Sequence, residues 1–503
     1  MTVYNFNLGI GWASSGVEYA QYYRALNFRQ LGVDTKFIFT DFISEENVEE
    51  LTNNIGYRDD ECWWLYQALT DFKFAPTTYS LDELQAGFDR PVIKTETDQK
   101  RVKFFFAEQD WALAVLREAN GEVVERVEYV FDGILARKDY FSYARTMTEY
   151  FAPLNGIAQI VLRRYFNTDG SVAFDELIDG DQKPVYRFKD QLFYSKYELI
   201  GYFVRSLNLT AKDVIIIDRA TGLAQEILEN KGPAKVGVVV HADHFSEPNT
   251  NADNILWNNF YEYTFDHPQD VDFFITATEA QKELLEEQFA KYAQVHPAIY
   301  AIPVGSLENL KHPTFERCPH SIITASRLAG EKHIDWLVQA VANVHQEFPD
   351  VTLDIYGRGG EENTIVTAIN NRQASDYIHL KGHQDLDQVY LDYQVYASAS
   401  TSEGFGLTLL EAIGSGLAMV GFDVRYGNQT FIKDDDNGYL VPYDTDEDSA
   451  TAIKGLTEGL LKLFWEDRLE ANAQGSYELA ENYLTAKVEQ RWQQLLTEVT
   501  ANA

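Results

Sequence analysis

The feature that most constrains this fold is a change of hydrophobic period along the 503 residues. Short apolar runs such as VIIID, VGVVVH and DFFITA alternate with helical stretches, and a second series of the same kind begins at HSIITASRL. Continuous apolar runs of this length are typical of buried parallel strands. The first stretch, from Val3 to Phe39, indicates one further strand–helix–strand unit. The sequence therefore predicts two Rossmann-like domains, with a ligand cleft between them at the carboxyl ends of the strands.

Between these series lies a block with strand-like alternation. Runs such as VKFFFA, ALAVLRE and VVERVEYVF are separated by the turn pairs Asn120-Gly121, Asp132-Gly133, Asp169-Gly170 and Asp179-Gly180. Both residues of such pairs tolerate positive φ, which tight hairpin turns require. We therefore predict an antiparallel β-meander inserted into the first domain.

These patterns give a domain organisation with four parts. They are a first Rossmann-like domain, an inserted meander, a second Rossmann-like domain and a C-terminal helix, at residues 1–44 with 195–305, 45–194, 306–485 and 486–503. The last helical pattern is amphipathic and runs from about Tyr477 to Val499. We expect it to close the second domain or to pack back on the first.

Charge and cysteine usage narrow the function classes. A net charge of −36 opposes nucleic acid and anionic lipid as partners. Two distant cysteines, Cys62 and Cys318, give no disulfide framework. The N-terminus lacks the pattern of a signal peptide, and no apolar run approaches the ~18 residues that span a bilayer. These features favour a cytoplasmic protein that is not an integral membrane protein.

The stretch TSEGFGLTLLEAIGSG places two carboxylates, Glu403 and Glu411, around a strand-to-helix bend. The strand VYASAS precedes the bend, so backbone N–H groups and a helix N-terminus point into the predicted cleft. Glycines at 404 and 406 allow a ligand to approach the backbone. For a lone pair of glutamates, however, a helix-terminus charge and a solvated helix face are the simpler interpretation.

A second loop, SRLAGEK, follows the strand SIITA and carries Arg327 and Lys332. Arginine offers a planar fork and lysine a point charge, and both suit a diphosphate. Surface pairing with Glu331 is the alternative. The coincidence with the glutamate pair favours the phosphate interpretation.

Three further loops carry polar residues. Gly16 opens the first helix, where a phosphate could approach the N-terminus. VVVHADHFSE follows a strand, and its His241, nearest the strand end, is a candidate contact for the reacting ligand. The acidic run IKDDDNG ends in an Asn-Gly turn, which favours a solvated loop over a metal site.

Taken together, Glu403-Gly-Phe-Gly-Leu with Glu411, SRLAGEK, IPVGS, YGRGGE and NGYLVP resemble the retaining GT-B glycosyltransferases that use nucleotide sugars. The start NLGIGWASSGVEYAQ and the meander are similar to one branch in particular, the accessory Sec glycosyltransferases of Gram-positive bacteria. That branch starts O-glycosylation of serine-rich-repeat adhesins with N-acetylglucosamine from UDP-GlcNAc. The resemblance implies a GT-B fold and a UDP-GlcNAc:protein O-GlcNAc transferase, a hexosyltransferase. In such a fold the first Rossmann-like domain would lie on the acceptor side, and the second would bind the nucleotide sugar.

The resemblance also implies roles for single residues. Glu403 would contact hydroxyls of the donor sugar, and Glu411 would hold the ribose hydroxyls. Arg327 and Lys332 would bind the diphosphate and stabilise the leaving UDP. The loop KGHQD would hold the uracil, and the first helix would line the cleft. The remaining donor-binding candidates are Gly16, Val17, Glu18, Gly382, His383, Gln384, Gly404, Phe405, Gly406 and Leu407.

The implied mechanism retains the configuration of the sugar. Two carboxylates ~5–5.5 Å apart can achieve this by double displacement. The resemblance favours front-face departure, in which UDP oxygens help to deprotonate the incoming hydroxyl. No cofactor or metal is expected, because Arg327 and Lys332 supply the positive charge for the leaving group.

The expected partners are a serine-rich-repeat acceptor polypeptide and a paralogous stabilising, substrate-binding subunit. We expect docking on the meander, whose aromatics include Trp63, Trp64, Trp111, Tyr140 and Phe141, although each ring taken alone is better explained as core. Contact with the inner face of the membrane would be peripheral.

Three alternatives stay open. A teichoic acid glucosyltransferase that uses UDP-glucose would need a strongly basic acceptor groove, and only Lys100, Arg101 and Lys103 cluster in the sequence. A glycoside hydrolase would not need Arg327 and Lys332. A non-catalytic acceptor-binding or chaperone subunit would have lost the glutamates and the basic pair. The sequence leaves open GlcNAc against glucose as the donor sugar, the identity of the acceptor, the oligomeric state and the stoichiometry with a partner. It also leaves open whether transfer proceeds by front-face departure or by double displacement.

Overall fold

The structure is a computed structural model that describes residues 1–12, 16–44, 46–180, 182–446 and 448–501. The chain forms two compact units. Unit 1 comprises residues 1–239, 259–272 and 499–503, and unit 2 comprises residues 240–258 and 273–498. Across the described ranges, no helix is long and apolar enough to cross a membrane.

Unit 1 contains a parallel sheet in the order β15-β14-β1-β2-β3. Its strands are β1 Thr2–Asn7, β2 Asp34–Phe39, β3 Cys62–Trp64, β14 Val214–Ile217 and β15 Lys235–Val240. The helices of this unit are α1 Gly16–Leu31, α2 Val48–Ile55, α3 Leu65–Ala68, α4 Leu81–Ala86, α5 Lys196–Ser206, α6 Ala224–Asn230 and α7 Glu262–Asp266.

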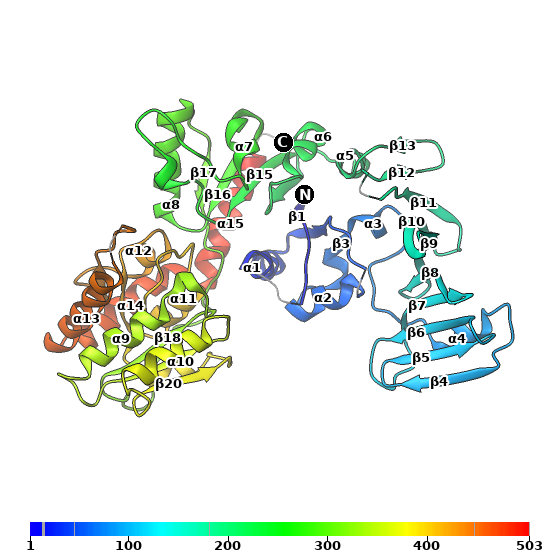
Figure 1. Cartoon of the computed structure of the whole chain (residues 1–503). Coiled ribbons are helices and arrows are strands. Elements are labelled where there is room, and N and C mark those ends of the chain that lie inside the picture. The colour runs from blue at the N-terminus through cyan, green and yellow to red at the C-terminus, as the bar shows by residue number, and fades with distance from the viewer. Residues whose placement is uncertain (13–15, 45, 181, 447, 502–503) are drawn as a thin grey trace. The chain divides into compact units, whose positions relative to one another are not determined.

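The predicted meander is present in unit 1 as one antiparallel sheet, in which each strand from β4 to β13 pairs with the next (Figure 1). Its strands are β4 Lys94–Asp98, β5 Arg101–Phe105, β6 Trp111–Leu116, β7 Val124–Phe131, β8 Ile134–Phe141, β9 Arg145–Leu154, β10 Ile157–Phe166, β11 Val172–Leu177, β12 Val185–Arg187 and β13 Leu192–Phe193. Asn120, Asp132 and Gly133 adopt positive φ, as the turn pairs predict.

Two features of unit 1 differ from the sequence-based prediction. Trp63 and Trp64 do not belong to the meander, because β3 pairs in parallel with β2 through Ile38 and Phe39. The longest hairpin, β9–β10, was missed. It turns at Asn155 and Gly156, both with positive φ.

A buried ion cluster links the meander to earlier residues of unit 1. Arg163 of β10 contacts Glu149 at 2.9 Å and Glu176 at 3.2 Å, and its guanidinium lies 3.8 Å from the ring centre of Phe42. Both carboxylates are buried, so their charge is balanced inside the protein.

Unit 2 contains a parallel sheet in the order β20-β19-β18-β21-β22-β23, and it also contains the parallel pair of β16 with β17. The strands are β16 Phe273–Thr276, β17 Ile299–Ala301, β18 Ser321–Ala325, β19 Thr352–Tyr356, β20 Ile378–Gly382, β21 Val395–Ser398, β22 Ala418–Phe422 and β23 Gly438–Val441. The helices are α8 Glu279–Gln288, α9 Ile334–Val344, α10 Glu362–Asn371, α11 Leu407–Gly414, α12 Gly427–Phe431, α13 Ser449–Trp465, α14 Leu469–Ala480 and α15 Thr485–Thr500.

Successive residues of β18 face two different cores of unit 2. Ile322 packs with apolar residues of α9, α10 and α13, whereas Ile323 packs with those of α11 and with Ala480 of α14. Helices therefore cover both faces of the sheet, which explains why its strands are apolar throughout.

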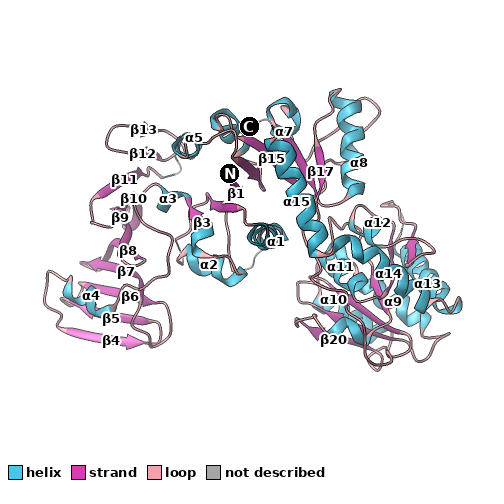
Figure 2. Ribbon diagram, turned by 180° about the vertical axis from the view of Figure 1, so that it is seen from behind, coloured by secondary structure: helices cyan, strands magenta, loops and turns pink. Residues whose placement is uncertain are grey.

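The last helical pattern forms two helices, α14 and α15, and not the single helix predicted from Tyr477 to Val499 (Figure 2). Between them the backbone pairs with Leu307, which donates to Tyr483 O at 2.9 Å and accepts from Thr485 N at 2.8 Å. This pairing diverts the chain from helical geometry.

Candidate functional site

The candidate site lies at the carboxyl end of the sheet of unit 2, where the strand order reverses. β18 lies between β19 and β21 in the sheet. The strands β18 to β20 follow one another toward one edge of the sheet, and the strands β21 to β23 follow one another toward the opposite edge. Loops at such a switch point diverge and leave a crevice for ligands. The loops with Arg327, Lys332 and Glu403 follow these two central strands.

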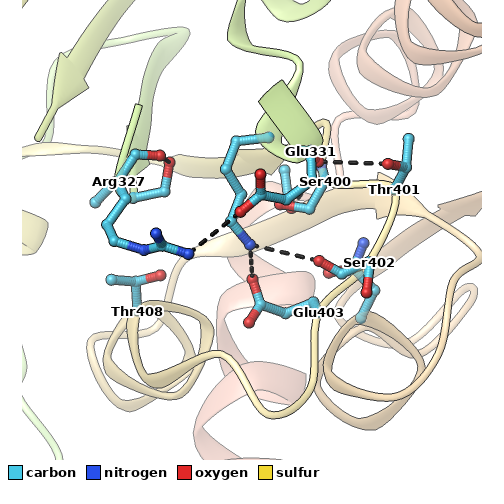
Figure 3. A network of polar contacts seen from close by, with 12 residues as sticks. Arg327, Glu331, Ser400, Thr401, Ser402, Glu403 and Thr408 are labelled. Carbon is cyan, nitrogen blue, oxygen red and sulfur yellow. Dashed lines mark hydrogen bonds and ion pairs between the residues drawn. The ribbon is translucent and has the colours of Figure 1, made fainter. Parts of the chain in front are cut away.

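The structure brings Lys332 and Glu403 into direct contact. Figure 3 shows Glu403 within the polar network that also contains Arg327, Glu331 and Ser402. Lys332 Nζ lies 2.8 Å from Glu403 Oε2, and the two side chains are 11% and 22% exposed. Lys332 Nζ also lies 3.4 Å from the carbonyl oxygen of Ser402. A lysine and a glutamate that are 71 residues apart thus form one charged centre.

Arg327 behaves differently. Its side chain is 79% exposed, and its guanidinium contacts Glu331 at 3.3 Å. The alternative of surface pairing with Glu331 is therefore present. An exposed ion pair of this kind contributes little to stability, so an anionic ligand can replace Glu331 as the partner of the guanidinium.

Backbone hydrogen bonds fix both loops. Thr401 N donates to Glu331 O at 3.0 Å, which joins the two loops directly. Tyr396 of β21 donates to Ala325 O at 2.9 Å and lies 2.9 Å from the hydroxyl of Thr408 in α11. This buried tyrosine ties the end of β18 to the start of the helix after Glu403.

A segment that sequence reasoning missed holds the backbone of Glu403. Tyr426 N and Gly427 N donate to Glu403 O at 2.7 and 2.8 Å, and Glu403 N donates to Arg425 O at 3.3 Å. A Cβ on Gly427 would lie 2.3 Å from Phe405 O, so only glycine fits there. The sequence feature that could have indicated this close approach of two backbones is the glycine in VRYGNQ.

The two predicted glycines of the Glu403 loop serve the fold in different ways. A Cβ on Gly404 would lie 3.2 Å from His241 O, so this glycine allows the loop after β15 to approach. Gly406 has φ of +85° at the N-cap of α11. Phe405 is buried and packs against Phe431, with ring centres 5.1 Å apart, and Leu407 begins α11.

Glu411 lies in α11 and is mostly buried. The hydroxyl of Tyr390 donates to its carboxylate at 2.9 Å. Burial raises the pKa of Glu411 above its ordinary value, against the opposing hydrogen bond from Tyr390. Glu411 is therefore a hydrogen-bonded side chain and not a solvated face residue.

The loop after β15 contains an uncharged histidine. His244 is fully buried, with Nε2 2.7 Å from Gln288 Oε1 and Nδ1 3.1 Å from the hydroxyl of Tyr426. Burial lowers its pKa to about 4. Asp243 lies 3.5 Å from the hydroxyl of Ser402, and burial raises its pKa. His241 is half-buried at the start of this loop.

The remaining predicted site residues lie at two places. Gly382 ends β20 with φ of +70°, and the exposed His383 and Gln384 follow it. Gly16, Val17 and Glu18 begin α1 in unit 1, while the preceding loop residues 13–15 lie outside the described residues. Glu18 is only 4% exposed, and its carboxylate accepts from Asn7 at 3.1 Å.

The acidic run of IKDDDNG forms a surface loop, as predicted. Asp434 accepts from Leu440 N at 2.7 Å, and Asp435 pairs with Lys462 at 3.4 Å. Within the described ranges, no cluster of three or more His, Cys, Asp or Glu side chains is arranged to hold a metal ion.

Comparisons with known proteins agree with this architecture. Residues 94–190 match the GtfA extended beta-sheet domain, and residues 319–458 match Glycosyl transferases group 1. The chain is 53% identical over 500 residues, 99% of each chain, to the UDP-N-acetylglucosamine–peptide N-acetylglucosaminyltransferase GtfA subunit of Streptococcus gordonii.

Two solved structures cover nearly the whole chain. The crystal structure of a GtfA/B complex superposes with a TM-score of 0.97 at 52% identity over 100% of both chains. The pneumococcal O-GlcNAc transferase GtfA in complex with UDP and GlcNAc superposes with a TM-score of 0.88 at 50% identity over 99% of both chains. The fold class predicted from the sequence, GT-B with an inserted antiparallel sheet, is confirmed.

Proposed function

This chain belongs to the GtfA family of UDP-N-acetylglucosamine–peptide N-acetylglucosaminyltransferase subunits, and we propose that it transfers N-acetylglucosamine from UDP-GlcNAc to serine or threonine hydroxyls. The observation that carries the proposal is the Lys332–Glu403 contact at the switch point of the sheet in unit 2. It places a cation for phosphate and a carboxylate for hydroxyls at one edge.

The basic residues and the glutamates have separate roles in this proposal. Lys332 and Arg327 bind the diphosphate, and Lys332 also orients the Glu403 carboxylate. Glu403 accepts hydrogen bonds from the sugar, and Glu411 from the ribose. Positive charge next to the bond that breaks stabilises the leaving UDP.

The other predicted residues complete the donor site. Gly382, His383 and Gln384 hold the uracil, and the backbone from Gly404 to Leu407 approaches the donor at the start of α11. His241 contacts the sugar, and Gly16, Val17 and Glu18 contribute from α1. Glu403 forms an ion pair with Lys332, and hydrogen bonds fix the backbone of Glu403. Both features suit a binding and electrostatic role for Glu403 better than nucleophilic attack.

The reaction retains the sugar configuration by front-face departure. The acceptor oxygen forms a bond to C1 of the sugar as the bond from C1 to the phosphate oxygen breaks. The acceptor proton passes to a phosphate oxygen of the departing UDP. Lys332 and Arg327 lower the cost of the negative charge that develops on UDP, so no metal is needed for this step.

The acceptor and partner follow from the family and from the charge of the chain. We infer a serine-rich-repeat adhesin as acceptor, modified in the cytoplasm before export, and a GtfB-type partner docked on the sheet of β4 to β13. A net charge of −36 disfavours a teichoic acid acceptor, which is itself anionic. Membrane contact, where it occurs, is peripheral.

The test uses the full chain together with its GtfB-type partner. Labelled UDP-GlcNAc or UDP-glucose is supplied with a Ser/Thr-rich polypeptide, with and without EDTA. The proposal predicts β-eliminable label from UDP-GlcNAc in preference to UDP-glucose, and an unchanged rate in EDTA. Transfer from UDP-glucose alone would refute the donor assignment, and loss of activity in EDTA would refute the metal-free step.

A further inference from the structure

A cavity of about 630 Å³ lies beside the Glu403 loop in unit 2. Its walls come from the loops that follow β15, β21, β22 and β23, so it opens at the edge of the sheet that carries the candidate site. Its size falls within the roughly 300–1,000 Å³ of ordinary ligand sites. None of the roles proposed above for the donor uses this cavity.

The cavity and the charged centre share one loop. Thr401 and Ser402 line the cavity, and Glu403 is the next residue. Arg425 also lines it, and the Arg425 carbonyl accepts from Glu403 N. A molecule in the cavity would therefore contact Ser402, the residue that directly precedes Glu403 in the chain. Glu403 carries the carboxylate that we assign to the donor sugar.

The charges that line the cavity are mostly negative. The one cation among its described lining residues is Arg425, whose guanidinium contacts Glu247 at 3.0 Å and lies 4.8 Å from the ring centre of Phe245. The lining carboxylates are Asp243, Glu247, Asp423 and Asp444. Such a lining repels phosphate and suits hydroxyl, amide or ammonium donors.

Two of these carboxylates are exposed and held in position. Asp423 Oδ1 accepts from Gln429 Nε2 at 2.9 Å, and Asp444 Oδ1 accepts from Asp446 N at 3.0 Å. Each carboxylate has further lone pairs for a ligand, because an ionised carboxyl group can accept about four hydrogen bonds.

We propose that this cavity binds the acceptor polypeptide next to the reacting serine or threonine, and that it selects neutral or basic hydroxyl-rich segments over anionic ones. The proposal rests on the transferase function proposed above. Asp423 and Asp444 accept hydrogen bonds from N–H and O–H groups of the acceptor polypeptide. This contact lies inside the cavity, beside the Glu403 loop. The same charges repel polyol phosphates and therefore favour a protein acceptor over teichoic acid.

The experiment measures acceptor kinetics with the full chain and its GtfB-type partner. The acceptors are three serine-rich peptides of equal length with Ala, Lys or Glu beside the serines. The variants are Asp423→Asn and Asp444→Asn, with Asp446→Asn as the matched control, because Asp446 is exposed nearby but does not line the cavity. UDP-GlcNAc hydrolysis in the absence of peptide reports on donor handling alone.

We expect wild type to show the lowest Michaelis constant for the Lys peptide and the highest for the Glu peptide, about 3- to 10-fold apart. Asp423→Asn and Asp444→Asn should shrink that difference and leave hydrolysis unchanged. Asp444→Lys should reverse this order, so that the Glu peptide has the lowest Michaelis constant and the Lys peptide the highest. The control should match wild type.

The outcomes separate this site from the function on which it rests. Normal transfer by both Asn variants, with the charge preference of wild type, would overturn the cavity as an acceptor site while leaving the transferase intact. Absence of transfer by wild type to every peptide would refute the transferase proposal and the site with it. Unfolding of a variant is detected by its melting temperature, and Asp444→Lys then supplies the decisive comparison.

Discussion

Replacing Lys332 with methionine separates the structural role of this lysine from its role toward the donor. The variant keeps most of the side-chain volume but leaves Glu403 without its cation. At 2.8 Å the pair has a Coulomb attraction of about 6 kcal/mol at an effective dielectric constant of about 20, most of which desolvation cancels. Losing one partner of a fully buried pair costs about 3–5 kcal/mol. This pair is slightly exposed, so we expect unfolding to become easier by about 2 kcal/mol.

Donor affinity should fall at the same time. A charge-assisted contact to phosphate contributes about 1.5–3 kcal/mol, so calorimetry should show UDP-GlcNAc bound roughly 10- to 100-fold more weakly. The double variant Lys332→Met/Glu403→Gln should regain most of the stability, because no unpaired charge remains, but none of the affinity.

Two controls sharpen this prediction. Arg327→Met removes an exposed cation, so it should weaken donor binding while changing the unfolding free energy by less than about 0.5 kcal/mol. Lys454→Met breaks an exposed pair with Glu458 in α13 and should change neither quantity. Wild-type affinity for UDP-GlcNAc in Lys332→Met would refute the reasoning.

Three further predictions concern groups around the site and in the sheet of β4 to β13. His244 has a pKa of about 4 in the folded chain, so wild type should lose about 3 kcal/mol as the pH falls from about 6.5 to about 4, and His244→Asn should flatten that loss in urea titrations. A raised pKa at Glu411 means that its burial favours the folded state at low pH and opposes it as the pH rises. Glu411→Gln should therefore raise the melting temperature at pH 7 and weaken UDP binding, and a lower melting temperature would contradict this. Arg163→Met should destabilise unit 1 by about 2–4 kcal/mol, because Glu149 and Glu176 are left buried without their cation, and chemical denaturation that shows no change would count against the ion cluster.

The sequence predicts the fold of unit 2 well because its signals are local. Apolar runs indicate the parallel strands, and loops after adjacent strands must meet at one edge, so the sequence alone associates Lys332 with Glu403. Their direct contact could not be predicted, because it depends on how SRLAGEK turns after β18. The backbone clamp from Arg425 to Gly427 was missed for the same reason, since it is a contact between loops.

Errors arose where tertiary contacts override local pattern. The helical period continues from Tyr477 past Thr485, but pairing with Leu307 interrupts the helix. Trp63 and Trp64 lie among turn-rich sequence, yet hydrogen bonding to β2 makes them part of the parallel sheet. Local propensity could not identify either partner, since both lie far along the chain.

The most direct test of the central claim is the rate of N-acetylglucosamine transfer by Glu403→Gln at saturating UDP-GlcNAc and acceptor. The account predicts a loss of about 10²- to 10³-fold in kcat, because the carboxylate acts on the sugar as charge develops. The melting temperature should fall by only roughly 2–4 °C, as for Lys332→Met, because one charge of the ion pair is lost in either variant. Glu458→Gln, which removes a surface carboxylate of unit 2, should transfer at the wild-type rate. A normal rate in Glu403→Gln would contradict the account.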